Sequence, residues 1–392
     1  MKRYILIFLI LSTVSSLFAQ KIDAGQKQFN AAVLYHTQGD YNEAIAAFTR
    51  YITSHPPETR AFFFRGYSYL KKADLKNALS DFKSASALDK KNDKAFFYVG
   101  KTYYRMKQYE KAIEWFNKAI GLNSKHASAL NDRGMSYFKL GYFDEAIIDF
   151  QSATFIQPNF AMAYNNIGSA IFFNQNVANP TKRDLIKAKD AFSNAIKYDP
   201  SLFVAYYNRS SVNYFLKNYD VALADIQNAM SLKPENAMCY FYEGVILGKK
   251  GSYQAGINSL EAALNLVPSL SFAYEEIANL HKAQKNYNQA LTTYEKAIKL
   301  SKKKSFQGLM HYYKAIVYAL QEDETNMYNA LKKAHAKKVF RDKKVYLAFG
   351  NEKAFKPYRL ESRFKKIARK ARKGKKENKF EDSELSWFRL EH

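Results

Sequence analysis

The chain has 392 residues, of which 47% are hydrophobic, so it can bury an extensive core. Its formal charge is +25, which favours an anionic partner. Judged by charge alone, nucleic acid would be such a partner. Cys239 is the only cysteine, which excludes an intrachain disulfide and leaves stability to packing.

The first nineteen residues have the layout of a secretory signal. Lys2 and Arg3 precede an apolar run, Tyr4 to Leu11, and a small, polar stretch then leads to Ala19. We expect cleavage near Ala19 and a periplasmic or secreted protein. An uncleaved anchor is the alternative, but the apolar run is short for a membrane span. No cysteine follows the cleavage region, so a lipid anchor is not expected, and export argues against a nucleic-acid partner.

A small residue recurs along the rest of the chain at nearly constant intervals. The steps are 34 residues long, except for 42 between Ala146 and Ala188. The series consists of Ala44, Ala78, Ala112, Ala146, Ala188, Ala222, Gly256 and Ala290. Such a period is typical of a helical repeat array, which works mainly by presenting surface.

Other positions of the repeat follow the same period. Twelve residues before each member of that series stands a second small residue, such as Gly66, Gly100 or Gly134, and four after it stands a bulky one, such as Phe82. Small residues at both places allow two antiparallel helices to approach closely, and bulky ones fill the space around the contact. Gly39, Gly141 and Gly251 fall at the predicted turn between helices, where positive φ is needed.

This pattern resembles the tetratricopeptide repeat family, secreted bacterial type. The resemblance implies an all-α, right-handed superhelical solenoid of helical hairpins, with eight clear repeats and a degenerate ninth. The predicted array spans 20–341, and a basic cap and tail, partly disordered, spans 342–392. The repeats are placed at about 25–58, 59–92, 93–126, 127–160, 161–202, 203–236, 237–270, 271–304 and, for the degenerate one, 308–341. Asn213 and His281 replace an expected aromatic residue and suggest locally looser packing.

The fifth repeat carries eight additional residues between its helices, within 174–187. Asn179-Pro180, together with Thr181 and Asp184, reads as a helix start, so we expect the second helix of this repeat to begin early. The insertion marks a working edge of the array or is a tolerated surface loop.

The resemblance also indicates where a partner binds, because the first helix of each hairpin lines the concave surface in this family. The residues carried over to that surface are Phe64, Tyr98, Asn131, Asn165, Asn166, Tyr207, Asn208 and Tyr242. Asparagine pairs with peptide backbone through both its donor and its acceptor, and aromatic side chains supply contact area. The alternative is structural, since asparagine is common at this family position and the aromatics pack against adjacent repeats. A carboxylate clamp is not expected, although Lys101 and Arg105 share a helix face.

The C-terminal part is strongly basic. Residues 332–392 hold 21 Lys and Arg against 8 Asp and Glu. Phe355, Tyr358, Phe364 and Ile367 are expected to cover the end of the last hairpin. The basic residues of the tail are Arg363, Lys365, Lys366, Arg369, Lys370, Arg372, Lys373, Lys375 and Lys376. They bind an anionic membrane surface or polymer, or they form a solvated tail.

No phosphate-binding loop, nucleophile motif or metal-ligand spacing occurs, so we predict no enzyme activity, no cofactor and no metal. The expected function is a scaffold or adaptor of the cell envelope that binds a peptide or helix of a partner protein. The alternative is a binder of anionic surfaces or envelope polymers through the basic tail, with the repeats as a spacer.

Overall fold

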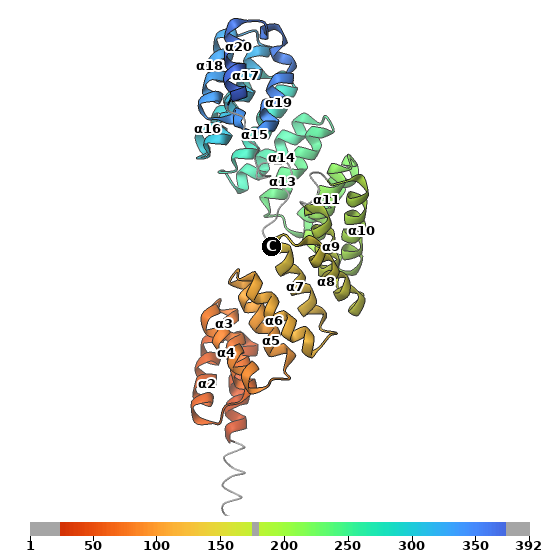
Figure 1. Cartoon of the computed structure of the whole chain (residues 1–392), viewed down its shortest axis with the longest axis vertical. Coiled ribbons are helices and arrows are strands. Elements are labelled where there is room, and N and C mark those ends of the chain that lie inside the picture. The colour runs from red at the N-terminus through yellow and green to blue at the C-terminus, as the bar shows by residue number, and fades with distance from the viewer. Residues whose placement is uncertain (1–23, 175–179, 374–392) are drawn as a thin grey trace, which may run out of the picture. The chain divides into compact units, whose positions relative to one another are not determined.

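The computed structural model describes residues 24–174 and 180–373, and all regular elements in these ranges are helical. The predicted signal segment therefore lies outside the described residues. The chain separates into two compact units, and the boundary between them in the sequence falls between residues 179 and 180. Figure 1 labels most of the helices of both.

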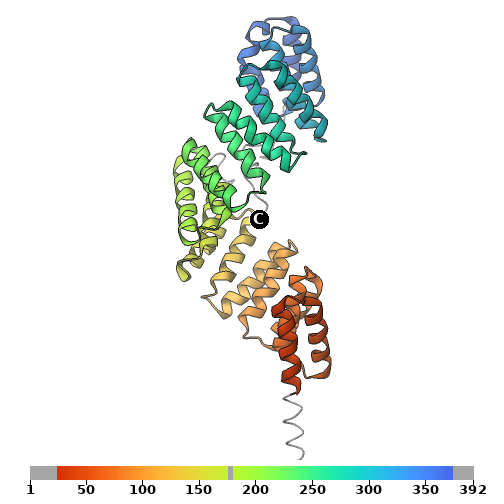
Figure 2. The same ribbon diagram turned by 180° about the vertical axis from the view of Figure 1, so that it is seen from behind.

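The first unit consists of four stacked hairpins and the first helix of a fifth. A helix over residues 24–38 is followed by α2 (Tyr41–Ser54), α3 (Thr59–Lys71), α4 (Leu75–Leu88), α5 (Asp93–Arg105), α6 (Tyr109–Leu122), α7 (Ala127–Leu140), α8 (Phe143–Ile156) and α9 (Ala161–Phe173). Within this unit each helix from α2 onward contacts the next one in the chain, so neighbouring hairpins lie side by side (Figures 1 and 2).

The second unit continues the same pattern. Its helices are α10 (Lys182–Tyr198), α11 (Phe203–Phe215), α12 (Tyr219–Leu232), α13 (Ala237–Lys249), α14 (Tyr253–Leu266), α15 (Ser271–Ala283), α16 (Tyr287–Leu300), α17 (Lys304–Leu320) and α18 (Glu324–Ala336). They are followed by the 3-10 turn η1 (Val339–Arg341), α19 (Lys343–Asn351), the 3-10 turn η2 (Lys353–Tyr358) and α20 (Ser362–Lys373). The ninth hairpin begins at Lys304, four residues before the start expected from the sequence.

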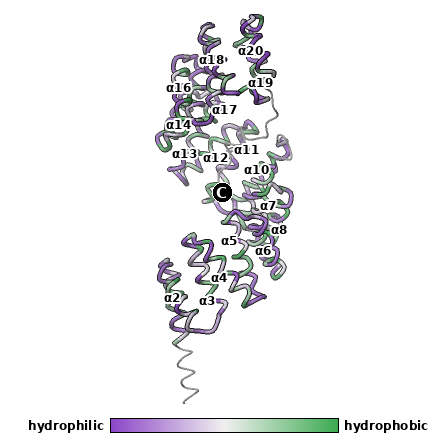
Figure 3. Tube along the Cα trace, turned by 60° about the vertical axis from the view of Figure 1, so that its left-hand side comes forward, coloured by the Kyte–Doolittle hydropathy of each residue, from purple (hydrophilic) through white to green (hydrophobic). Residues whose placement is uncertain are grey.

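Small residues bring the two helices of a hairpin together. A Cβ on Gly134 of α7 would lie 2.7 Å from Cε1 of Phe150 and 3.1 Å from the carbonyl oxygen of Ala146, both on α8. Hydrophobic and hydrophilic residues alternate along the helices, as Figure 3 shows, because each helix buries one side in its neighbours.

The hairpin turns use left-handed backbone, which the glycines predicted. Gly39, Gly141 and Gly251 have φ of 88°, 84° and 83°. The equivalent turns of other repeats place Lys107 and Lys217 there, among other non-glycine residues, with φ near 60°. The last turn of a first helix therefore closes in the same way whether or not glycine is available.

The second helix of the fifth repeat begins early, as predicted. α10 has 17 residues, and Thr181 caps its N-terminus. The Thr181 hydroxyl accepts from the backbone N–H of Asp184, and the Asp184 carboxylate accepts from the backbone N–H of Thr181. This capping box satisfies two backbone donors that the helix start leaves unpaired.

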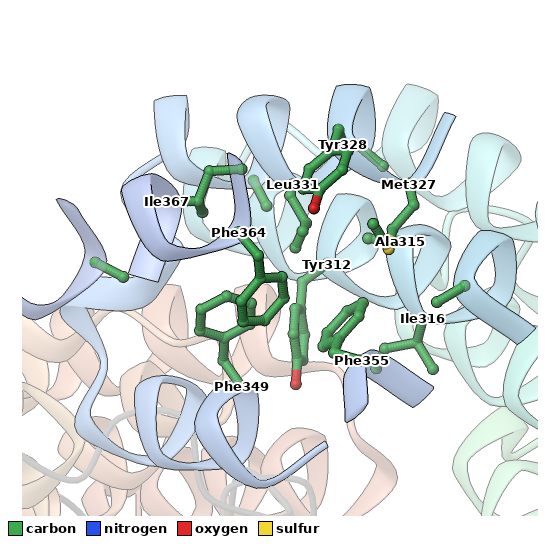
Figure 4. Close-up of a cluster of buried hydrophobic side chains, with 14 of the residues drawn as sticks. Tyr312, Ala315, Ile316, Met327, Tyr328, Leu331, Phe349, Phe355, Phe364 and Ile367 are labelled. Carbon is green, nitrogen blue, oxygen red and sulfur yellow. The ribbon is translucent and has the colours of Figure 1, made fainter. Parts of the chain in front are cut away.

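The C-terminal elements cover the apolar end of the last hairpin, which confirms the expectation for Phe355, Phe364 and Ile367. These side chains are buried together with Phe349 against α17 and α18, as Figure 4 shows. The rings of Phe349 and Phe364 are stacked with centroids 5.1 Å apart. Among the described residues, α20 thus covers the apolar end of the stack and presents a polar outer side.

Candidate partner-binding surface

The first-helix face of the first unit begins with a row of aromatic rings. His36 contacts Phe64 and Tyr67, with ring centroids 5.8 and 5.2 Å away. Tyr67 and Phe63 each lie 5.3 Å from Tyr98 on the next first helix, edge to face. These side chains are half-buried, so the row joins three hairpins and still offers apolar contact area.

Polar residues continue this face on α5, α7 and α9. Lys101 Nζ lies 3.6 Å from a carboxylate oxygen of Asp132. Burial raises the pKa of Asp132, while the Lys101 ammonium lowers it. Asn131 donates to Asp132 at 3.1 Å and accepts from Asn166 at 2.9 Å, so the polar side chains form one connected network.

Lys101 and Arg105 both have partners within the fold. Lys101 pairs with Asp132, and Arg105 donates from Nη1 to the carbonyl of Leu70 at 2.7 Å.

The corresponding face of the second unit combines buried tyrosines with a buried carboxyl. The rings of Tyr207 and Tyr242, on α11 and α13, lie edge to face at 5.1 Å. Glu275 on α15 is only 5% exposed. Burial, reinforced by Glu276 and opposed by Lys282, raises the pKa of Glu275 to about 8. This carboxyl is therefore largely protonated near neutral pH and can donate a hydrogen bond.

Most of the residues expected to bind a partner contribute little open surface. Phe64 and Tyr98 are half-buried, whereas the other six are buried, namely Asn131, Asn165, Asn166, Tyr207, Asn208 and Tyr242. Their packing and hydrogen bonds hold the first helices together, as the structural alternative anticipated. Their contact with a partner stays a prediction.

The expectation of looser packing at Asn213 is wrong. Asn213 is 2% exposed and donates to Asp225 at 3.1 Å. The amide thus replaces the aromatic residue by joining a buried polar bridge.

That bridge recurs along the array and was not predicted from the sequence. In each bridge, a residue on the first helix of a hairpin contacts two others. One lies sixteen positions earlier, on the second helix of the preceding hairpin, and the other lies sixteen positions later, on the second helix of the same hairpin. Arg65 donates to both carboxylate oxygens of Asp81 at 2.8 Å and to the hydroxyl of Thr49 at 3.1 Å. Equivalent bridges consist of Asn117, Arg133 and Asp149, of Ser193, Arg209 and Asp225, and of Gln227, Glu243 and Ser259. The recurrence of Arg with Asp sixteen residues later was the available signal.

Helix α20 carries those of the predicted basic residues that lie before residue 374, where the described part of the chain stops. Phe364, Ile367 and Ala371 of α20 face the core. Arg363, Lys365, Lys366, Arg369 and Lys370 are exposed on its other sides. Arg372 and Lys373 lie in the last turn of α20, and Lys375 and Lys376 lie outside the described residues.

No group of three or more His, Cys, Asp or Glu side chains among the described residues has a metal-binding arrangement. No described helix is long and apolar enough to cross a membrane.

The stacked hairpins and their first-helix face define the class, an α-solenoid. Models of the tetratricopeptide repeat match residues 29–93 and residues 204–236 and 273–304, and a model of anaphase-promoting complex, cyclosome, subunit 3 matches residues 76–153. The chain is a tetratricopeptide repeat protein. This family typically provides non-enzymatic scaffolds that mediate protein–protein interaction.

Similar proteins include eukaryotic and bacterial members. Protein STIP1 homolog of Dictyostelium discoideum is 35% identical over 98 residues, covering 25% of this chain and 17% of that protein. Human tetratricopeptide repeat protein 6 is 31% identical over 113 residues, covering 29% of this chain and 22% of that protein. The chain thus spans under a quarter of either relative. A tetratricopeptide repeat protein from Parabacteroides merdae shares the fold, with 18% identity, a TM-score of 0.50, and coverage of 66% of this chain and 98% of that one.

Proposed function

We propose that this chain is a scaffold of the bacterial cell envelope that binds a peptide or helix of a partner protein on its first-helix face. The observation that carries the proposal is the half-buried aromatic row of Phe63, Phe64, Tyr67 and Tyr98. Aromatic side chains in a fixed arrangement supply contact area at low entropic cost, which is typical of interface anchors.

The charged and amide groups beside the aromatic row determine the direction in which a peptide binds. Lys101 and Asp132 lie next to the aromatic rings, and their ion pair is partly open to solvent. A peptide that lies along the row meets an apolar surface first and then hydrogen-bonding groups. Such an order favours one orientation of the bound segment.

The envelope location rests on the signal-like residues 1–19. N-terminal sequencing of the native protein tests it. We expect a periplasmic or secreted chain that begins near Gln20. A chain that retains Met1 in the cytoplasmic fraction contradicts this part of the proposal and leaves the binding face untouched.

A second candidate function is supported by α20, whose basic residues Arg363, Lys365, Lys366, Arg369 and Lys370 are exposed. In this reading the helix binds anionic lipid headgroups or an envelope polymer, and the repeats act as a spacer. Binding of this kind weakens steeply with added salt, because it depends on exposed charges.

Two full-length variants separate the candidates. The first replaces Tyr67 by Ser and Tyr98 by Leu, and the second replaces Lys365, Lys366 and Lys370 by Gln. Scaffold function predicts that only the first variant loses crosslinked partners from native envelopes. Surface binding predicts that only the second does so. Thermal unfolding of both variants shows whether loss of capture reflects loss of fold.

A further inference from the structure

The recurrent polar bridge is interrupted at α15, as it also is at Val99 of α5. The central position of the bridge, filled by Arg65, Arg133, Arg209 or Glu243 in other repeats, is held here by Ile277. Ile277 is 5% exposed and has no polar atom with which to join its neighbours. The flanking residues, sixteen positions away on either side, are Glu261 of α14 and Thr293 of α16.

A groove of about 640 Å³ opens at this place, between α14, α15 and α16. Its lining includes Glu261, Tyr274, His281, Asn288, Thr293 and Lys296. The volume lies in the range of small-ligand sites, roughly 300–1,000 Å³. One bound side chain would not fill this volume, so the groove also has room for the backbone next to that side chain.

The groove retains polar groups that can accept further hydrogen bonds. Within residues 24–174 and 180–373, Glu261 makes no hydrogen bond or ion pair, although burial lowers the pKa of the neighbouring His281 and the negative charge of Glu261 raises it. Nδ1 of His281 is buried and has no hydrogen-bond partner there. The Thr293 hydroxyl donates to the carbonyl of Gln289 at 2.8 Å and keeps lone pairs that can accept.

We propose that this groove binds the arginine side chain of an extended peptide from a partner protein. The guanidinium would occupy the place that Arg65, Arg133 and Arg209 fill in their own repeats, with Glu261 and Thr293 as acceptors. A guanidinium presents donors in a fixed fork that matches a carboxylate and a second acceptor, as the Arg65 bridge shows. A lysine ammonium lacks this fork.

The remaining groups suit the peptide around that side chain. Asn288 and Gln289 offer amide donors and acceptors for backbone groups. Lys296, which is exposed, can pair with a carbonyl or carboxylate of the same peptide. This site lies on the second helices and the outer side of α15, so it is independent of the first-helix face proposed above.

The test uses the full-length chain and a blocked Gly-Arg-Gly peptide, with Gly-citrulline-Gly and Gly-Lys-Gly peptides for comparison. NMR or calorimetric titration should show saturable binding of the arginine peptide. We expect binding to be at least tenfold weaker for the other two, because citrulline lacks the charge and lysine lacks the fork.

Two variants test whether the peptide binds in this groove. Glu261→Gln should weaken arginine-peptide binding at least tenfold, and its exposed position leaves the fold intact. Ile277→Arg should abolish binding and raise the melting temperature, because the chain then fills its own site. Glu110→Gln, an exposed carboxylate of α6, is the matched control and should bind as the parent does.

Three results would overturn the proposal: no saturable binding, equal binding of the citrulline peptide, or binding unchanged in both Glu261→Gln and Ile277→Arg. Loss of binding in Lys296→Gln but not in Glu261→Gln would also overturn it, since an anionic group would then be recognised. None of these results affects the first-helix face.

Discussion

Arg133 donates from Nε and Nη2 to the two carboxylate oxygens of Asp149, at 2.8 and 2.6 Å, and so ties the helices of one hairpin together. Its third contact, from Nη1 to Asn117 at 2.6 Å, reaches the preceding hairpin. One side chain therefore links three helices, and the same geometry recurs at Arg65 and Arg209. The bridges add directional contacts to a stack that is otherwise held by apolar burial.

Asp149→Asn removes the charge partner of Arg133. The Asp149 side chain is 4% exposed, so the guanidinium would stay in a partly buried site without its counter-ion. We expect a loss of roughly 2–4 kcal/mol in the free energy of unfolding, measured with urea.

Asp220→Asn is the control for that variant, because its ion pair with Lys250 is exposed. Exposed pairs contribute about 1 kcal/mol or less, so this change should be small. Equal losses in the two variants would contradict a special role for the bridges.

Gly134→Ala tests the close approach of α7 and α8. The new methyl group would meet the Phe150 ring at 2.7 Å and a backbone oxygen, so we expect about 1–3 kcal/mol of destabilisation by overpacking. Gly121→Ala on α6 meets no atom within 4 Å and should stabilise the helix by about 0.5–1 kcal/mol. Urea unfolding of both variants gives the comparison, and destabilisation of similar size at both sites would argue against it.

Lys217→Gly should stabilise the turn between α11 and α12. Lys217 has φ of 62°, a left-handed conformation that costs a residue with a Cβ about 1–2 kcal/mol. Glycine relieves this cost but gains freedom in the unfolded chain, so we expect a net gain of up to about 1 kcal/mol.

Lys249→Gly provides the matched control, since Lys249 is exposed in the last turn of α13. There glycine should destabilise the helix by about 0.5–1 kcal/mol. A lower melting temperature for Lys217→Gly than for the parent would show that the turn is not strained.

The sequence predicted the helical hairpins well, because their determinants are local and periodic. The small residues Gly134 and Ala146 indicate a close contact between two helices, and Thr181 with Asp184 indicates the start of a helix. Surface properties were harder to predict. Asn131, Asn166 and Tyr242 occupy the expected helix positions, but their burial depends on neighbouring repeats, which a single repeat pattern does not specify. The polar bridge was not predicted, because its central position holds apolar residues such as Val99 and Ile277 in some repeats.

Glu275 should make stability depend on pH. Its pKa is raised from an ordinary value near 4.5 to about 8, so between these values the folded state holds a proton that the unfolded chain releases. Stability therefore falls as pH rises from about 5 through about 8, by an amount on the order of a few kcal/mol.

Urea midpoints across this pH range, for the parent and for Glu275→Gln, measure the effect. In Glu275→Gln, most of the fall in stability with rising pH should disappear. Glu276→Gln should reduce it in part, because Glu276 contributes to the raised pKa. Parallel pH profiles in the parent and Glu275→Gln would contradict the assignment.

The central claim is that the first-helix face contacts a partner protein, and site-specific photocrosslinking in native envelopes tests it most directly. A photoreactive amino acid is placed at Tyr67, on the aromatic row, or at Phe155, which is 88% exposed on the second helix α8. The account predicts a discrete crosslinked protein from position 67 and none from position 155. Crosslinking from position 155 alone would place the partner on the second helices and contradict the claim.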